Sequence, residues 1–489
     1  MTSSLSRQLG LSALVATGVC SMLGASINVV PFMIQRNVPG IGPYVLYAFA
    51  FAAIPALLAA MAYSILATSM PRAGGSYVYA SRGLNPYLGF VASFSQWFGL
   101  SVVIGVVAYV TVPFFRDIAA NLGYPQLAAV FETGWVRVGL ALTMLWVFVY
   151  VNIQGAKQYE KTVVPLMIVM FILGSVVIFA GYALTQEDFL MAYEAKTGVK
   201  ATLVDHGDFD LLTFFSAGSI LFASFIGFDS IAQAGGEAKD PSRSLPLAIG
   251  LTILIVGGYY MLFSGAVYHA VPWSFVASEA LIRDITAPGL LGYLLPSGLT
   301  VLIIAGAAIA LINDLPAMLL SVSRLMFAWS EDGIFPKFIS KIHPENKTPA
   351  TAILLSGAMA SVGILGSHFA GDFFLGIDIM VTSMMVNFLL MCFTLLSIDK
   401  VNPGLAMEIS LVKKKWMRKA IGVTGVLVLL FFLAVHVWKD FQAEVEAWYF
   451  HSTPIWLMVM GLASLIFAFQ YNALKNSGKD VDKHFKILP

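Results

Sequence analysis

The chain has few charged residues and almost no cysteine, and each of these features excludes certain classes of protein. Charged side chains make up 11% of its 489 residues, against 58% for hydrophobic ones. A soluble globular protein carries roughly 25% charged residues, so this composition indicates a membrane protein. The two cysteines, Cys20 and Cys392, lie far apart within apolar segments. In practice this excludes a disulfide framework and a cysteine-based metal site.

The sequence also lacks the motifs of several function classes. No basic run is interleaved with aromatic residues, so we expect no nucleic-acid partner. No paired-histidine metal motif or G-x-S-x-G turn is present, so we expect no enzyme. No span repeats a charged or carbonyl-rich filter, which disfavours a channel. The N-terminus shows no cleavable signal peptide, because its first apolar run is long and contains Pro31.

Long apolar runs, in contrast, recur along the whole chain. A helix that crosses a bilayer needs about 20 apolar residues. The sequence therefore predicts an all-α integral membrane protein with twelve transmembrane helices. The predicted spans are about 11–34, 43–69, 86–114, 137–155, 162–184, 211–235, 246–270, 298–329, 350–367, 373–398, 420–438 and 453–472.

The distribution of basic residues predicts the topology. If both termini are cytoplasmic, 21 of the 28 Lys and Arg residues lie on the inner side and 7 on the outer side. Cytoplasmic loops of membrane proteins carry such an excess, so we expect a cell-membrane protein with both termini inside. A basic cluster at 413–419 suits this side and a membrane-lipid partner. The outer seven are Arg36, Arg116, Arg137, Lys196, Lys200, Arg283 and Lys439.

Two of the predicted spans carry signs of a break in the helix. The sixth span places Asp229 near membrane depth, beside Gly227. A carboxylate there costs about 2.5–3.5 kcal/mol on insertion scales, so it has a function or a partner. The first span contains Gly24 and, further on, Pro31. Interrupted spans at corresponding positions of two halves are typical of a transporter site, although such glycines also serve close helix packing.

Three segments resemble the amino acid–polyamine–organocation superfamily, in its cationic-amino-acid-transporter-like branch. CSMLGASINVVP at 20–31 is similar to the family's G-S-M-I-G-S-G-I-F-x-x-P. FIGFDSIAQAGGEAKDPSRSLP at 225–246 resembles F-x-G-F-D-x-x-x-x-x-x-E-E-x-x-x-P-x-R-x-x-P. SRLMFAWSEDGIFP at 323–336 resembles S-R-x-x-x-x-x-x-x-D-G-x-x-P, and a T-P pair follows at 348–349.

The resemblance implies a LeuT-like fold with a 5+5 inverted repeat and two appended helices. The repeats would be 1–184 and 211–398, and 420–489 would hold the last two spans and a cytoplasmic C-terminal tail. Helices 1 and 6 would be unwound at the substrate. The implied function is a secondary active transporter, or permease, for amino acids or related small amines, which works by alternating access as a symporter or exchanger.

Residues at the two breaks are the candidates for substrate binding. The backbone of 24–26 would hold a substrate carboxylate, and carbonyls of 223–226 its amino group. Several positions depart from the family, with Cys20, Ser26, Asn28, Gly236 and Ala223 replacing its usual residues. The substrate-binding candidates are Ser21, Gly24, Ala25, Ser26, Asn28, Phe222, Ala223, Phe225, Ile226, Gly227 and Asp229.

Two aspartates within the spans carry different hypotheses. Asp229 is interpreted mainly as a structural or gating latch, and otherwise as a partner for a substrate amine. In the LeuT-like fold that the resemblance implies, a residue of the eighth helix faces the first helix and completes a sodium site. Asp314, in the middle of the eighth span, falls close to that position and is the candidate for ion coupling. It would hold Na⁺ with carbonyls around Gly18–Cys20, or take and release a proton. A charge neutralised by a polar neighbour, with no transport role, stays open. Members of the family that couple transport to protons through a lysine carry it in the fifth span. The fifth span here has no lysine, which argues against that mechanism.

Gates are expected on both sides of the site. The candidates are Tyr109, Phe228, Met318, Glu237 and Arg243. The expected ligands are a small-molecule substrate and, as the only ion, Na⁺ or H⁺, with no other cofactor. Oligomeric state and substrate identity stay open. The alternative function is a substrate-binding sensor or non-transporting subunit with the same fold.

Overall fold

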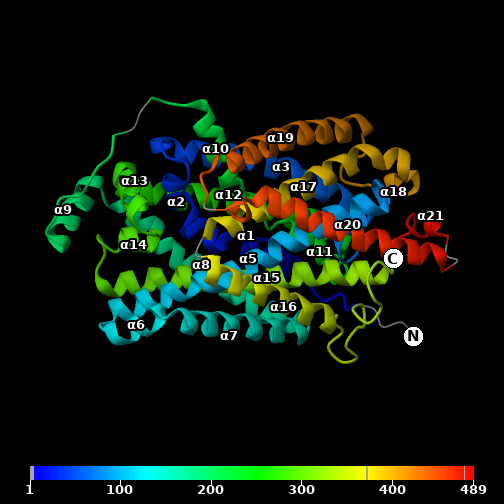
Figure 1. Ribbon diagram of the computed structural model, residues 1–489, viewed down its shortest axis with the longest axis horizontal. Coiled ribbons are helices and arrows are strands. Elements are labelled where there is room, and N and C mark those ends of the chain that lie inside the picture. The colour runs from blue at the N-terminus through cyan, green and yellow to red at the C-terminus, as the bar shows by residue number, and fades with distance from the viewer. Residues whose placement is uncertain (1–4, 206–207, 371–372, 446, 478–479) are drawn as a thin grey trace.

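The protein is described here from a computed structural model that covers residues 5–205, 208–370, 373–445, 447–477 and 480–489 (Figure 1). Within these ranges the regular elements are helices, and the only strand-like contacts are isolated bridges of Leu9 with Ala238 and Ala73 with Ala234. The prediction of an all-α protein is confirmed.

Eleven helical segments of the described chain are long and apolar enough to cross a bilayer. They match eleven of the twelve predicted spans, although α5, α8, α12 and α19 each extend beyond a predicted end by five to seven residues. The eleven are η1 with α3 (Gly42–Tyr44 and Val45–Ser69), α5 (Pro86–Asn121), α7 (Gly134–Ile153), α8 (Ala156–Ala183), α10 to α11 (Leu211–Gln233), α12 (Pro241–Ala270), α15 (Ser297–Glu331), α16 (Ala350–Ala370), α17 (Phe373–Val401), α19 (Lys415–Gln442) and α20 (Ser452–Asn476).

The first predicted span differs from these eleven because it is interrupted. It forms α1 (Leu11–Asn28) and α2 (Val30–Asn37), and Gly24 inside α1 has a non-helical ψ of −107°. The apolar part before the break, Leu11–Gly24, is shorter than the roughly 20 residues that a bilayer core requires. Glycine tolerates this geometry with little steric cost, and Pro31 starts α2 without losing a helical hydrogen bond.

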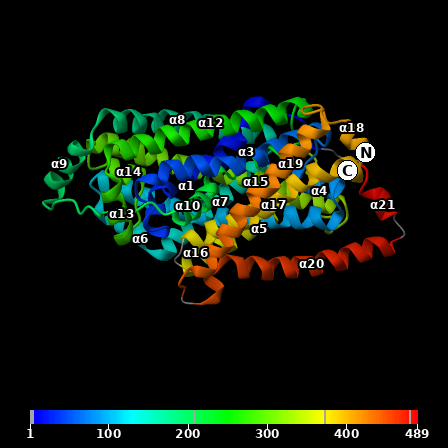
Figure 2. The ribbon, with the colours of Figure 1, turned by 90° about the horizontal axis from the view of Figure 1, so that it is seen from above.

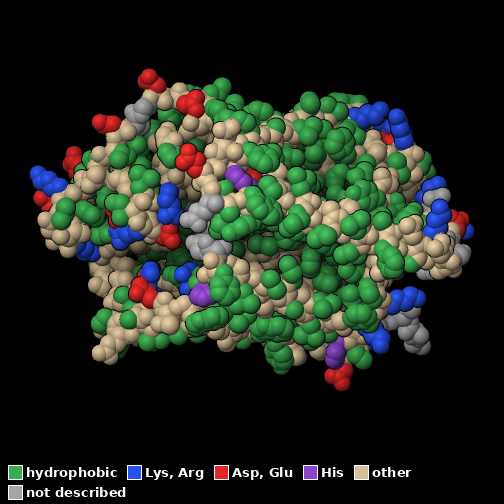
Figure 3. Space-filling model, viewed as in Figure 1, with side chains coloured by type: hydrophobic (Ala, Val, Ile, Leu, Met, Phe, Trp, Pro, Cys, Tyr) green, Lys and Arg blue, Asp and Glu red, His purple; other side chains and the backbone are tan. Residues whose placement is uncertain are grey.

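Short helices gather at the end of the molecule opposite the two termini (Figure 1). They are α6 (Pro125–Glu132), α9 (Gln186–Thr197), α13 (Trp273–Ile282) and α14 (Ala287–Leu291), which fill connections that the sequence left as loops. A capping box between Thr185 and Asp188 starts α9. Charged side chains gather at the two ends, and hydrophobic ones cover the middle (Figure 3).

The end that carries the termini is closed by buried ion pairs. Arg82 pairs with Asp332 and Arg324 with Glu237, and every one of these side chains is at most 2% exposed. Burial alone would lower the pKa of Arg82, but its hydrogen bond to Asp332 and the charge of that carboxylate raise it.

The remaining short helices are α4 (Gly75–Gly83), α18 (Pro403–Met407), η3 (Trp448–Phe450) and α21 (Val481–His484).

The C-terminal tail covers this closed end. Arg82 Nε donates to the carbonyl of Ile487 at 3.1 Å, and its guanidinium lies 5.3 Å from the centroid of the Phe485 ring. Asn402 Nδ2 donates to the carbonyl of Lys486 at 2.9 Å. The tail therefore joins α4 and the end of α17, whereas α20, which precedes it, runs along one side of the bundle (Figure 2).

Candidate functional site

The sixth predicted span is broken in the middle of the protein. After α10 (Leu211–Leu221) the chain forms the short 3-10 helix η2 (Phe222–Phe225), an extended Ile226, and then α11 (Asp229–Gln233). Gly227 has a φ of +139°, a conformation that strains any other residue. A Cβ at Gly227 would overlap the carbonyl of Ser21 on α1, so the break is packed directly against the first helix.

The break in α1 lies against α15. A Cβ at Gly24 would overlap the carboxylate of Asp314, so this glycine permits the close approach of the acid. Asp314 is 3% exposed, and Pro316 follows it inside α15. Because a proline donates no backbone hydrogen bond, α15 is weakened near the acid. The eighth span therefore brings its carboxylate to the break in the first.

One tyrosine of α12 joins the two breaks. The hydroxyl of Tyr260 lies within hydrogen-bonding distance of the carbonyls of Met22 and Ser224, the second at 2.7 Å. Ser224 Oγ also donates to the carbonyl of Ser26 at 3.4 Å. A hydroxyl has one proton, so Tyr260 donates to one carbonyl at a time. Carbonyls that the breaks release from helical pairing thus meet at a shared polar centre.

A small cavity lies where the breaks meet α5, α15 and α17. Its volume is about 20 Å³, room for roughly one water molecule. An amino acid does not fit, so a substrate requires the surrounding helices to move apart. Among the described residues of the lining, Asp314 is the only charged one. The lining residues are Ser21, Ser26, Val30, Val103, Val106, Val107, Ala223, Ile226, Asp314, Met318, Ile377 and Met380.

The structure thus gathers part of the predicted binding set around one cavity. Gly24 and Gly227 lie at the breaks beside it, and the side chain of Ala25 is outside the described residues. Phe222, Phe225, Asn28 and Asp229 do not line it. The predicted residues that do are Ser21, Ser26, Ala223, Ile226, Asp314 and Met318.

The aromatic and amide candidates outside the cavity have packing partners elsewhere. The Phe225 ring lies 5.5 Å from those of Phe49 and Tyr260, and the Phe222 ring lies 5.9 Å from Phe388. Asn28 Nδ2 donates to the carbonyl of Gly24 at 3.3 Å. Asn28 therefore satisfies a backbone group of the break and does not face the cavity.

Asp229 belongs to a buried hydrogen-bond network and is fully buried. Gln96 Nε2 donates to its Oδ2, and the amide of Gly227 donates to Oδ1 at 3.0 Å. Gln96 Oε1 accepts in turn from Ser76 Oγ at 2.5 Å and from Asn387 Nδ2 at 3.3 Å. These hydrogen bonds link α11 to α4, α5 and α17. The interpretation of Asp229 as a structural or gating latch stays a prediction.

Replacing Gln96 with leucine is expected to destabilise the protein by about 1–3 kcal/mol, because it leaves the buried Asp229 carboxylate without its side-chain donor. Thermal unfolding of the purified protein in detergent measures the loss. The matched control is Gln154→Leu, since Gln154 ends α7 and is exposed. Equal unfolding temperatures for both variants would contradict the latch.

The residues proposed for the ion site separate in the structure. Gly18 packs against Ile231 and Thr252, and Cys20 Sγ accepts a hydrogen bond from Asn313 Nδ2 at 2.9 Å. Asp314 instead meets α1 at Gly24. A cation held by Asp314 would thus lie nearer to the break than the sequence suggested. Among the described residues no group of three or more His, Cys, Asp or Glu side chains is arranged so that it could hold a metal ion.

The five gate candidates lie in different places. The hydroxyl of Tyr109 lies 3.1 Å from His368 Nδ1, toward the end with the short helices. Phe228 stacks on Phe388 in the core, at 5.0 Å between ring centroids. Met318 lines the cavity, and Glu237 accepts both hydrogen bonds of the Arg324 fork at 2.9 Å. Arg243 is exposed and, within the described residues, forms no ion pair.

Several residues of the cavity had no signal in the sequence. They are apolar side chains in apolar spans, so composition and spacing do not distinguish them from core or lipid-facing residues. Tyr260, which joins the breaks, is likewise one of 18 tyrosines. The missed lining residues are Val30, Val103, Val106, Val107, Ile377 and Met380.

Comparison of the sequence with known proteins shows the family of the chain. A family model described as amino acid permease matches residues 9–470. The chain belongs to the amino acid permease family. The permease is therefore a multi-pass membrane protein and a transporter of its family, and the prediction that it is no enzyme is confirmed by this membership.

Relatives of the permease differ in the substrates that their names give. It is 27% identical to the low-affinity putrescine importer PlaP of Escherichia coli over 73% of its own chain and 72% of the relative. It is 26% identical to the branched-chain amino acid permease BcaP of Bacillus subtilis, over 74% and 75%. The human cationic amino acid transporter 4 is also 26% identical, over 74% and 55%.

Proposed function

We propose that the permease is a secondary active transporter that moves an amino acid or a related small amine by alternating access, as an ion-coupled symporter or an exchanger. The observation that carries this proposal is the meeting of two broken helices and the Asp314 carboxylate at one cavity in the middle of the protein. Broken helices at membrane depth are tolerated where they line such a site.

The proposed architecture has twelve spans, with α1 and α2 together forming the first. The first five and the next five would be inverted repeats, 1–184 and 211–398, and 420–489 would add two helices and the tail. We place the protein in the cell membrane with both termini in the cytoplasm. The positive charge bias of the loops supports this orientation.

The two ends of the molecule support alternating access because they differ. The end with the termini is closed by the pairs Arg82–Asp332 and Arg324–Glu237 and by the bridge of Leu9 with Ala238. The other end holds a cavity of about 780 Å³. A conformation with a cavity at the outer end and ion pairs that close the cytoplasmic end is one of the two states that alternating access requires. In the other state these ion pairs would separate.

Chemical roles follow from the groups at the breaks. Amide N–H groups near Gly24 suit a substrate carboxylate, and carbonyls of 223–226 suit its amino group. Asp314 suits either Na⁺ or a proton, since it is a buried carboxylate beside backbone that is free of helical pairing. No Na⁺ or H⁺ gradient is required if the protein works purely as an exchanger.

Uptake into proteoliposomes under imposed Na⁺ and proton gradients tests the function. We expect accumulation of labelled amino acids or amines, driven by one of the gradients. Substrate that exchanges but does not accumulate under either gradient would make an exchanger. Binding without any flux would overturn the transport proposal and favour the sensor, which the departures at Ser26, Asn28 and Ala223 also allow.

Replacing Asp314 with asparagine is expected to lower gradient-driven accumulation by at least about tenfold, because one charged contact to a bound ion is worth roughly 1.5–3 kcal/mol. Exchange of internal for external substrate should persist. The matched control, Asp205→Asn, lies in the exposed connection before α10 and should leave both activities unchanged. Full accumulation in Asp314→Asn would remove Asp314 from the coupling mechanism.

A further inference from the structure

The cavity at the end opposite the termini holds an unusual share of the positive charge of that side. Its volume of about 780 Å³ is within the range of small-molecule sites. Five of the seven basic residues that the topology places outside line this one cavity. They come from five separate parts of the chain, namely α2, α5, α7, α9 and the end of α13. The five are Arg36, Arg116, Arg137, Lys196 and Arg283.

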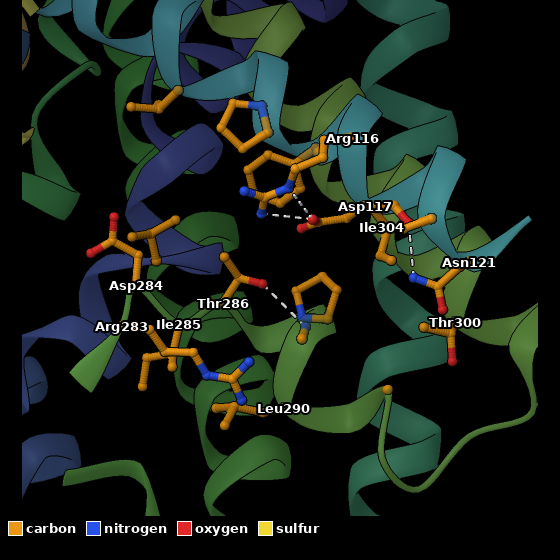
Figure 4. Close-up of a pocket in the computed structure, with 18 of the residues that line it drawn as sticks. Arg116, Asp117, Asn121, Arg283, Asp284, Ile285, Thr286, Leu290, Thr300 and Ile304 are labelled. Atoms are coloured by element: carbon orange, nitrogen blue, oxygen red, sulfur yellow. Dashed lines mark hydrogen bonds and ion pairs between the residues drawn. The ribbon is translucent and has the colours of Figure 1, made fainter. Parts of the chain in front are cut away.

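Three of these cations already have carboxylate partners. Arg36 pairs with Asp284 at 2.9 Å, and Arg116 pairs with Asp117 at 2.7 Å. Arg283 pairs with Glu279 one helical turn away. Figure 4 shows Arg116 and Asp117 on one side of the cavity, and Arg283, Asp284 and Thr286 of the α13–α14 connection on the other. These pairs fix the walls and leave little charge to attract a ligand.

The other two cations have no carboxylate partner in the described part of the chain. Arg137 donates from Nε to the carbonyl of Tyr109 at 3.0 Å, and its guanidinium lies 3.8 Å from the centroid of the Tyr109 ring. Lys196 donates from Nζ to the carbonyls of Gly292 at 2.9 Å and Leu295 at 3.3 Å. Both are held by neutral acceptors, so their full charges remain for an anion.

The larger cavity adjoins the broken helices on the side of the short helices α13 and α14. Val29 lines it, and the next residue, Val30, lines the small cavity. On α5, Val110 lines the larger cavity and Val107, one turn away, lines the smaller. A ligand in the larger cavity is therefore on the path to the site between the breaks, and it meets Arg137 and Lys196 before Asp314.

We infer that this cavity is an entry site for a carboxylate group, in which Arg137 and Lys196 bind the anion, and that the substrates are amino acids and not polyamines. A polyamine has only positive charges and would be repelled by the two cations, whereas an amino acid offers a carboxylate to them and an amino group to the deeper site. The inference rests on the proposed transport function and narrows its substrate class.

The experiment measures concentration-dependent uptake into proteoliposomes of a labelled mixture of the standard amino acids and of a labelled mixture of putrescine, cadaverine and spermidine. The variants are Arg137→Gln and Lys196→Gln, and the matched control is Lys200→Gln, an exposed residue four positions on that does not line the cavity. We expect uptake of amino acids only. Each cavity variant should raise the half-saturation concentration about tenfold, with less than a twofold change in maximal rate, and the control should match the wild type.

The outcomes separate the inference from the function beneath it. Uptake of the polyamines in place of amino acids, or unchanged half-saturation in both cavity variants, would overturn the entry site while transport stands. No uptake of either mixture, even into proteoliposomes preloaded with the same mixture unlabelled so that exchange is possible, would overturn the transport proposal and the entry site with it. Because Arg137 also contacts α5, a folding defect in Arg137→Gln leaves Lys196→Gln to decide.

Discussion

Replacing Arg324 with alanine is expected to destabilise the protein by about 3–5 kcal/mol, because it strands the buried Glu237 carboxylate without its partner. Both oxygens of Glu237 accept from the Arg324 fork at 2.9 Å, and neither side chain is more than 2% exposed. The pair joins α15 to the chain after α11, where the amide of Leu9 donates to the carbonyl of Glu237. Thermal unfolding in detergent measures the loss.

Two further variants separate a stranded charge from a general loss of packing. In Arg324→Met with Glu237→Gln no charge is buried alone, so the double variant should recover most of the lost stability. Lys415→Ala is the surface control: Lys415 lies 3.9 Å from Asp399, is 72% exposed and should cost about 0–1 kcal/mol. If the double variant unfolds as early as Arg324→Ala, the loss comes from packing, and the ion pair does not carry it.

The breaks could be predicted from local sequence because their causes are local. Gly24 and Pro31 in the first span, and Gly227 in the sixth, weaken a helix wherever they stand in an apolar run, and the structure interrupts both spans there. The same reasoning did not show how short the first helix would be. A hydropathy window averages across a break, so it reads 11–34 as one span.

The partners at the site could not be predicted because they are distant in sequence. Gln96 is 133 positions from Asp229, and Tyr260 is 238 positions from Met22. Among apolar spans any polar residue could meet any other, and only the packing of the helices decides. The same holds for the cavity of Arg137 and Lys196: the sequence placed both on the outer side but gave no reason for them to converge.

The position of the Asp314 carboxylate against α1 is possible only because Gly24 has no side chain. A sequence motif does not reveal such a contact, because it shows which residues are present and not where space is left between helices. The sequence placed Asp314 near the first helix, but opposite Gly18–Cys20 and not Gly24. One helical turn separates Cys20 from Gly24, so a small error in register moves the predicted contact from a helical segment to the break. At the break the acid lies against backbone of non-helical geometry, which the proposed function assigns to substrate and ion.

Replacing Gly24 with alanine is expected to lower uptake about 10–100-fold, because the new methyl group would overlap the Asp314 carboxylate and force the two helices apart. Overpacking of this kind costs about 1–3 kcal/mol. Here it destabilises the conformation in which the broken helix α1 packs against α15. Uptake into proteoliposomes measures the effect, after the amount of folded protein is matched by size-exclusion chromatography.

The matched control is Gly250→Ala in α12, where an added Cβ meets nothing within 4 Å and alanine is the better helix former. Its uptake should stay within about twofold of the wild type, since alanine there changes the free energy by only about 0.5–1 kcal/mol.

The double variant Gly24→Ala with Asp314→Ala removes the overlap. It should regain the thermal stability of the wild type but not gradient-driven accumulation, because the carboxylate is gone. Wild-type uptake by Gly24→Ala alone would mean that Asp314 swings clear of α1 at no cost. Coupling would then not require contact between the acid and the break.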